Sequence, residues 1–126
     1  MRRALLAIVL AATTSAVVEP HQEPATATPA QVAAAIDRLG SLEFPVRMEA
    51  ARTVRRAAPA VAVPALSGAS AQHKDGYVRF RALILLSGFN DPRTRDLMVQ
   101  MLADKNDRLR AVAYAFFEHN PDRAAL

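Results

Sequence analysis

The segment GYVRFRALILLSGFNDPR, residues 76–93, decides the fold class, because it fits two incompatible structures. Residues 78–81 alternate between apolar and charged side chains, which is the period of a half-buried β-strand. The next residues, ALILL at 82–86, are apolar without interruption, and such a run suits a buried helix equally well. The segment alone does not choose between strand and helix, so the choice depends on the rest of the chain.

The pattern of this segment occurs three times along the chain. Copies 32 and 31 residues apart begin at Val46 (VRMEAARTV), Val78 (VRFRALILL) and Leu109 (LRAVAYAFF). In the first copy Val46, Ala50 and Val54 stand at every fourth position, and the other copies keep this spacing of apolar or small side chains. Such a register indicates a helix, since a strand repeats every two residues. The alternation at 78–81 is therefore interpreted as a coincidence within one copy.

Helix-start signals and further apolar runs extend the pattern to six helices. Thr28-Pro29 and Asp91-Pro92 each offer an N-cap followed by a proline at the first helical position, where its missing N–H has little cost. Asp107 can cap the last helix. The low aromatic content (6%), the absence of Trp and the many alanines favour close-packed helices over a sheet. The predicted helices are 29–39, 45–57, 60–71, 77–88, 92–104 and 107–119.

These motifs resemble a known repeat family. The order VR-x-x-A-A, then A-V-P-A-L about a dozen residues later, then D-P-R at another helix start, is similar to the short bacterial HEAT-like repeats of the phycobilisome-lyase type. The resemblance spans residues 29–126 and implies an all-α, armadillo-type fold. This fold is a right-handed α-solenoid of antiparallel helix pairs, with about three repeats and a fourth just begun. The resemblance implies no single activity, because such repeats serve many tasks.

The N-terminal part of the chain has the composition of a targeting segment and a linker. Residues 1–18 begin with MRR and continue as an uncharged apolar run, too short for a comfortable membrane span of roughly 20 residues. We interpret them as a signal peptide, cleaved after Ala16, and residues 19–28 as a disordered linker of Pro, Ala and Thr. The expected localisation is periplasmic or secreted. The alternative is an uncleaved N-terminal segment that anchors the protein to a membrane.

The charge of the chain argues against a nucleic-acid partner. The full sequence of 126 residues carries 16 basic and 12 acidic side chains, a formal net charge of +4. Removing Arg2 and Arg3 with the signal peptide leaves 14 basic residues against 12 acidic ones, or +2. This is a weak balance for a protein that binds nucleic acid. The chain has no Cys, which excludes thiol catalysis, disulfides and a lipid anchor on cysteine.

Three arginines recur at the same place in the three copies: Arg47, Arg79 and Arg110. If the repeats stack, these arginines lie one repeat apart and close to turns that carry acidic residues. We predict a structural role, in which their guanidinium groups form a ladder of hydrogen bonds to turn carbonyls and carboxylates. The alternative is an anion-binding groove, and the near-equal number of acidic residues close by argues against it.

Equivalent positions of the three copies also predict a surface for a partner. The side chains expected on the concave side of the solenoid are mixed and partly apolar, which suits a peptide or a partner helix. Two alternatives are open: these side chains pack on neighbouring helices, or the arginines form a solvated basic face. The candidate residues are Met48, Arg52, Arg56, Phe80, Arg81 and Ile84.

The sequence offers no catalytic or metal-binding constellation. His21, His73 and His119 lie apart, and no two have the spacing of metal ligands on one helix. Some relatives of these repeats are di-iron hydroxylases with repeated His-Glu pairs, but the matching pairs here, Met48-Glu49 among them, contain no histidine. We therefore predict no cofactor and an exported scaffold without catalysis that binds an unknown protein partner. The alternative is a degenerate member or a subunit of a lyase or hydroxylase built from such repeats.

The last residues of the sequence have the start signal of a further helix. Asn120-Pro121 parallels Asp91-Pro92, yet few residues follow it. A helix of about one turn is too short to be stable by itself, so the preceding apolar helix has no cover. We expect this open end to be covered by further repeats, by a partner or by a second copy of the chain. Self-association would then use Tyr114, Phe116 and Phe117.

Overall fold

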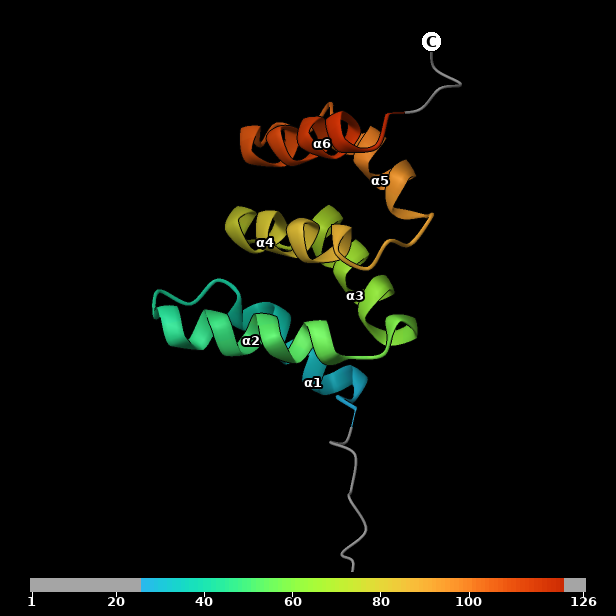
Figure 1. Cartoon of the computed structure of the whole chain (residues 1–126). Coiled ribbons are helices and arrows are strands. Elements are labelled where there is room, and N and C mark those ends of the chain that lie inside the picture. Colours follow the sequence, from blue (N-terminus) through green and yellow to red (C-terminus); the bar gives the residue numbers. More distant parts are fainter. Residues whose placement is uncertain (1–25, 122–126) are drawn as a thin grey trace, which may run out of the picture.

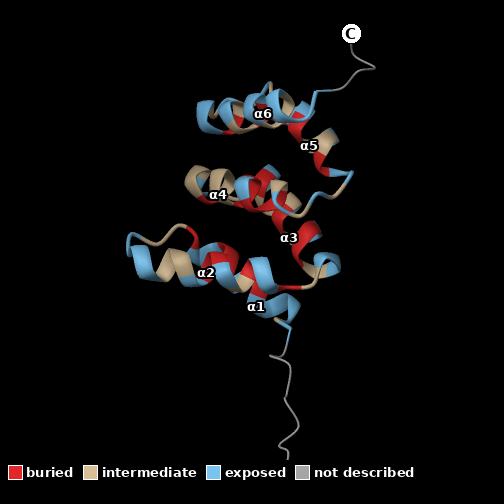
Figure 2. Cartoon of the chain, viewed as in Figure 1, coloured by how far each residue is buried: buried red, intermediate tan, exposed pale blue. Residues whose placement is uncertain are grey.

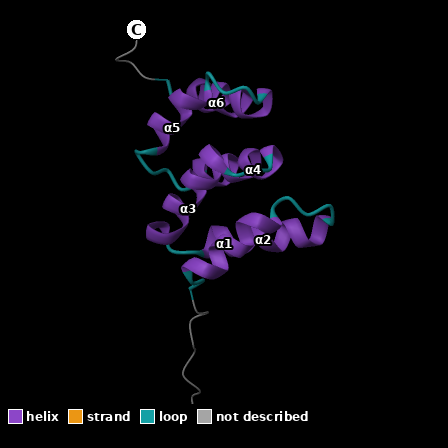
Figure 3. Ribbon diagram, turned by 180° about the vertical axis from the view of Figure 1, so that it is seen from behind, coloured by secondary structure: helices purple, strands orange, loops and turns teal. Residues whose placement is uncertain are grey.

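The computed structural model describes residues 26–121, which form α-helices joined by short loops (Figure 1). No part of this range is a β-strand (Figure 3). The six predicted helices are all present, and the all-α class is confirmed. The predicted signal peptide and most of the predicted linker lie outside the described residues. The helices are α1 (Pro29–Arg38), α2 (Phe44–Arg56), α3 (Pro59–Gln72), α4 (Gly76–Ser87), α5 (Thr94–Met101) and α6 (Asp107–His119).

The helices form three pairs that stack along one direction, as expected for a solenoid. Each pair has a first helix (α1, α3, α5) and a second helix (α2, α4, α6), and the second helices lie one above the other (Figure 1). The first helices form a row beside them, which Figure 3 shows from behind. The main contacts between pairs join each pair to the next one along the chain, so the fold is an all-α solenoid of repeated helix pairs.

The segment that fits both a strand and a helix is helix α4. Val78, Ala82 and Leu86 are at most 1% exposed, and they form one stripe along the helix. The strand interpretation of residues 78–81 is wrong, because burying this stripe against neighbouring helices requires the helical period. The repeat register predicted this helix. Ala50 and Ala113, the repeat equivalents of Ala82, are also fully buried.

Helix α5 is shorter at both ends than the prediction of 92–104. The carboxylate of Asp91 accepts the backbone N–H of Arg93 instead of capping a helix at Pro92, and the N–H of Thr94 bonds to the carbonyl of Asp91. At the other end, the N–H groups of residues 103 and 104 also bond three residues back. Both ends are therefore turns with i→i+3 hydrogen bonds, and only Thr94–Met101 is α-helical.

The starts of α1, α4 and α6 have side-chain caps. Thr28 caps α1 in a capping box with Gln31, and Pro29 occupies the first helical position, as predicted. The predicted cap of α6 is wrong by one residue. Asn106 is the N-cap and accepts the N–H of Arg108, whereas Asp107 is the first helical residue. An acidic residue at that place still favours the positive end of the helix dipole.

The core lies between the row of first helices and the row of second helices (Figure 2). It consists mainly of Ala, Val and Leu side chains, and small residues let neighbouring helices come close. The first loop also needs a small residue, because a Cβ on Gly40 would lie 2.8 Å from Cγ2 of Val78 and 2.9 Å from Oδ2 of Asp75. Glycine therefore lets the α1–α2 loop touch the start of α4.

Replacing Ala82 by Asp tests the helical register of α4. Ala82 is fully buried, so the substitution places an unpaired carboxylate between packed helices. We expect the free energy of unfolding to fall by about 4 kcal/mol. Circular dichroism melts measure the change. The matched control is Ala111→Asp on the exposed side of α6, which should change stability little. Equal melting temperatures for Ala82→Asp and the control would contradict this packing.

Candidate functional site

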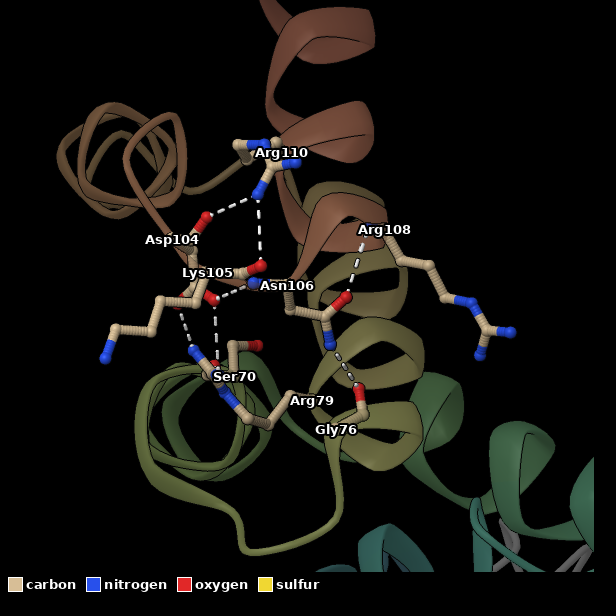
Figure 4. A network of polar contacts seen from close by, with 8 residues as sticks. All are labelled: Ser70, Gly76, Arg79, Asp104, Lys105, Asn106, Arg108 and Arg110. Carbon is tan, nitrogen blue, oxygen red and sulfur yellow. Dashed lines mark hydrogen bonds and ion pairs between the residues drawn. The ribbon is translucent and has the colours of Figure 1, made fainter.

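Two of the repeat arginines bind the loop in front of their own helix. Arg47 donates from Nη1 to the carbonyl oxygens of Ser41 and Leu42, at 2.7 and 2.9 Å. Arg110 donates from Nη1 to the two equivalent carbonyl oxygens of the α5–α6 loop, at 2.8 and 3.1 Å (Figure 4). Loop carbonyls without helical partners thereby receive charge-assisted hydrogen bonds, which are stronger than neutral ones.

The middle arginine, Arg79, connects two repeats. Its Nε donates to the carbonyl oxygen of Ser70 in α3 at 2.8 Å. Its two terminal nitrogens donate to the two carboxylate oxygens of Asp104 in the α5–α6 loop (Figure 4). The side chains of Arg79 and Asp104 are only 19% and 15% exposed. This ion pair is therefore shielded from water, and it holds the third repeat to the second.

A second repeated contact, which the sequence interpretation missed, closes the loop within each helix pair. The side chains of Ser41, His73 and Asp104 occupy equivalent positions, and each accepts the backbone N–H two residues further on. The distances are 3.2, 3.0 and 2.8 Å. Three different acceptor atoms thus make the same turn before the second helix. The 32- and 31-residue spacing aligns these residues, and that alignment is the signal that could have found them.

The histidines within residues 26–121 have structural contacts. Because Nδ1 of His73 accepts the N–H of Asp75, its ring proton lies on Nε2, which donates to Asp37 of α1 at 2.9 Å. His119 donates from Nδ1 to the carbonyl oxygen of Ala115 at 2.8 Å. Across the described range, no three His, Asp or Glu side chains form a group that could hold a metal ion. His21 lies outside that range.

The six candidate residues of the partner surface divide by exposure. Arg52 pairs with Glu49 at 2.6 Å on the surface of α2. Phe80 packs against the core, and its ring centroid lies 6.0 Å from that of Tyr77. Packing on neighbouring helices, the alternative to a free surface, therefore applies to Phe80. The exposed members are Arg52, Arg56 and Ile84, and the half-buried members are Met48, Phe80 and Arg81.

Two hollows lie between the second helices, one on each side of Ile84. The exposed side of α2, α4 and α6 is called the second-helix face. The α2/α4 hollow has a volume of about 230 Å³. The α4/α6 hollow is larger, about 360 Å³, and continues past the end of α6. The α2/α4 hollow is lined by Arg55, Ile84, Leu85, Gly88 and Phe89. The α4/α6 hollow is lined by Ile84, Ser87, Val112, Ala115, Phe116 and His119, together with two asparagines.

A third hollow, of about 860 Å³, lies at the N-terminal end of the solenoid between α1 and α2. The residues that line it in α2 are the repeat equivalents of residues that line the other two hollows. The equivalent sets are 52, 84 and 115; 53, 85 and 116; and 56, 88 and 119. The repeat register therefore turns the same side of each second helix toward a hollow, although the residue types differ.

The repeat pattern agrees with a comparison against protein families. The sequence model of the HEAT repeats matches residues 32–116, about two thirds of the chain. The chain belongs to the HEAT-repeat family. No curated protein and no solved structure matches it. Among residues 26–121, no helix has the length and hydropathy needed to cross a membrane.

The first and last HEAT repeats have different outer faces. At the N-terminal end, α2 presents Arg52, Thr53 and Arg56 where α4 has Ile84, Leu85 and Gly88. A polar outer face of this kind is typical of a capping repeat. At the other end Tyr114 is 63% exposed, although its equivalents Ala51 and Leu83 are fully buried under the next repeat. Self-association through this end stays a prediction.

Two carboxylates in the loops of the HEAT repeats, those of Asp91 and Asp104, have lowered pKa values. The pKa of Asp104 lies below its ordinary value, first because Arg79 donates hydrogen bonds to the carboxylate and next because the backbone N–H of Asn106 does so. Arg93 lowers the pKa of Asp91 to about 2 through hydrogen bonds from its side chain and its backbone N–H. Both carboxylates are therefore ionised at neutral pH and bind arginines within the fold.

Replacing Arg79 by Met tests whether this arginine connects the repeats. At neutral pH we expect the free energy of unfolding to fall by about 2 kcal/mol, because charged hydrogen bonds in a shielded site are lost. The folded-state pKa of Asp104 lies below the unfolded-state value of about 3.9. The stabilisation by this carboxylate is thus present above that pH and is lost as the pH falls through the folded-state pKa.

Urea titrations between about pH 7 and pH 2 measure both effects. The Arg79→Met variant should lose less stability on acidification than the wild type, since the largest cause of the lowered pKa of Asp104 is then removed. Lys105→Met is the control, because Lys105 is exposed in the α5–α6 loop and contacts Arg110 through its backbone carbonyl, which the substitution keeps. The proposed link between repeats is wrong if Arg79→Met and Lys105→Met have the same stability and pH dependence.

Proposed function

We propose that this protein is a scaffold that binds another protein on the second-helix face and has no catalysis of its own. The observation that carries the proposal is Ile84, which is 37% exposed in the middle of α4 and lies between two hollows. An exposed apolar side chain flanked by hollows suits insertion of partner side chains. HEAT repeats commonly mediate protein–protein interactions, and a solenoid leaves one side of its second helices free for such contacts.

We also propose that the scaffold is exported. The support is the composition of residues 1–18, a basic start followed by an uncharged apolar run, which is typical of a secretory signal peptide. The weak positive charge that remains after its removal suits a protein partner better than nucleic acid.

Site-specific photo-crosslinking in the native cells tests the scaffold function. The full chain, with a C-terminal affinity tag, carries a photo-crosslinking amino acid in place of Ile84. We expect a defined partner protein to be joined to the chain at this position. The matched control replaces Gly68 of α3, where an added side chain meets no atom within 4 Å. That position lies on a first helix, so we expect no crosslink there.

Two results would contradict the proposal. One is the absence of any protein crosslinked at position 84 under conditions in which the chain is folded and expressed. The other is stoichiometric iron in the purified chain by metal analysis, which would instead favour the lyase or hydroxylase alternative. Crosslinks at position 68 with the same yield as at position 84 would mean that the second-helix face is not the binding surface.

Replacing Leu6 and Val9 by Arg tests export. Charges in the apolar part of a signal peptide prevent its recognition, so we expect the full-length chain to accumulate in the cytoplasm. Cell fractionation and intact-mass measurement follow the change. The wild-type chain should lie outside the cytoplasm and lack its first residues. A wild-type chain that is cytoplasmic and uncleaved would show that residues 1–18 are not an export signal.

A further inference from the structure

The second-helix face is basic along α2 and α4. These two helices contain six arginines and one acidic residue, Glu49, which pairs with Arg52. Two of these arginines, Arg47 and Arg79, donate hydrogen bonds to the backbone carbonyl oxygens of Ser41 and Ser70. The remaining arginines of the two helices have no hydrogen-bond or ion-pair partner among residues 26–121. They are Arg55, Arg56 and Arg81.

Arg81 is the most unusual of these arginines. Its Nε is buried and has no hydrogen-bond partner within the described part of the chain. A buried N–H without a partner costs free energy. Arg81 lies one helical turn before Ile84, so both residues are on the same face of α4. The arginine side chain of Arg81 therefore starts next to Ile84, the exposed apolar residue of this face.

The hollows beside Ile84 are suited to apolar side chains. Ile84, Leu85 and Phe89 supply most of the lining of the α2/α4 hollow, and Gly88 adds no side chain that would fill it. Ile84, Val112 and Phe116 supply the apolar part of the α4/α6 hollow. Because the two hollows are repeat equivalents, they are separated by about one helix-to-helix distance, 8–10 Å in packed helices.

This spacing matches a short extended peptide. In the polyproline-II conformation, residues three apart point to the same side and lie about 9 Å from each other. Two apolar side chains at such positions can enter the two hollows on either side of Ile84. Acidic residues next to them would lie close to the arginines of α2 and α4, which prefer carboxylate partners.

We propose that the second-helix face binds an acidic peptide segment of a partner protein, with two apolar side chains three residues apart. This inference rests on the proposed scaffold function and adds the chemistry of the partner. A phosphate polyanion, such as nucleic acid or an anionic membrane, matches the arginines but offers no pair of apolar side chains of this spacing. An acidic peptide matches both the charge and the hollows.

A synthetic peptide of eight residues, with leucine at its third and sixth positions and glutamate elsewhere, is the probe. Titration into the isotope-labelled full chain, followed by NMR, should shift the amide signals of α2 and α4. The same peptide with alanine in place of both leucines should bind about tenfold more weakly. The peptide with lysine in place of glutamate should not bind, because it repels the arginines.

Variants of the chain locate the binding surface. Ile84→Glu removes the apolar residue between the hollows, and Arg55→Glu reverses a charge beside the α2/α4 hollow. Each should weaken binding of the glutamate–leucine peptide about tenfold or more. The matched controls are Val99→Glu on α5 and Arg108→Glu at the start of α6, both at exposed positions away from the hollows. Their affinities should stay within about twofold of the wild type.

The inference is overturned if the lysine peptide binds as well as the glutamate peptide, or if neither binds at millimolar concentration. It is also overturned if a DNA oligonucleotide or a phosphatidylglycerol vesicle binds through Arg55 and the acidic peptide does not. Its failure is distinct from failure of the scaffold function. A partner still crosslinked at position 84 in a chain that ignores all these peptides would leave the scaffold standing and refute the acidic peptide.

Discussion

The structure depends on the burial of helix α4 between its neighbours. One buried stripe along α4 consists of Val78, Ala82 and Leu86. Leu83 and Leu85 of the same helix are also buried. A helix of this length is marginal by itself in water, so its stability comes from the apolar surface that neighbouring helices cover. The same requirement applies to α2 and α6 at equivalent positions. The solenoid forms because the apolar surface of each second helix cannot be covered within a single repeat.

The loops add direction to this packing. Apolar contacts between helices tolerate sliding, whereas the hydrogen bonds of Arg79 to Ser70 and Asp104 have one geometry. This arginine departs from the pattern of Arg47 and Arg110, which donate their hydrogen bonds to the loop before their own helix. The difference arises because Asp104 places a carboxylate within its reach. The second and third repeats are therefore joined by a charged contact as well as by apolar packing.

The same repeat positions serve different purposes along the solenoid. Residues 52, 53 and 56 are polar and line the hollow between α1 and α2 in the first repeat. Their equivalents in α4 are apolar or glycine and line the α2/α4 hollow. In α6 the set combines Phe116 with His119. Backbone geometry is thus shared by the repeats, while the chemistry of each hollow is set by substitution at a few positions.

Much of the architecture follows from the sequence alone. The spacing of Val46, Val78 and Leu109 predicts the helices and their order, because the period of apolar residues is a local property of the chain. The cap at Thr28 follows from local chemistry in the same way. The repeat positions do not separate the exposed candidates Arg52, Arg56 and Ile84 from the half-buried Met48, Phe80 and Arg81. The start of α5 was predicted wrongly, since an Asp-Pro pair can begin either a helix or a turn.

Only the tertiary structure decides which side chains meet. The contact of Arg79 with Asp104 spans 25 residues, and the hydrogen bond of His73 with Asp37 spans 36. The hollows beside Ile84 are likewise absent from any local pattern, and so is the Nε of Arg81, which has no partner among residues 26–121. All of them depend on the distance and angle at which one repeat packs on the next. Those quantities result from the fit of many side chains at once, whereas the helical period is written in each segment separately.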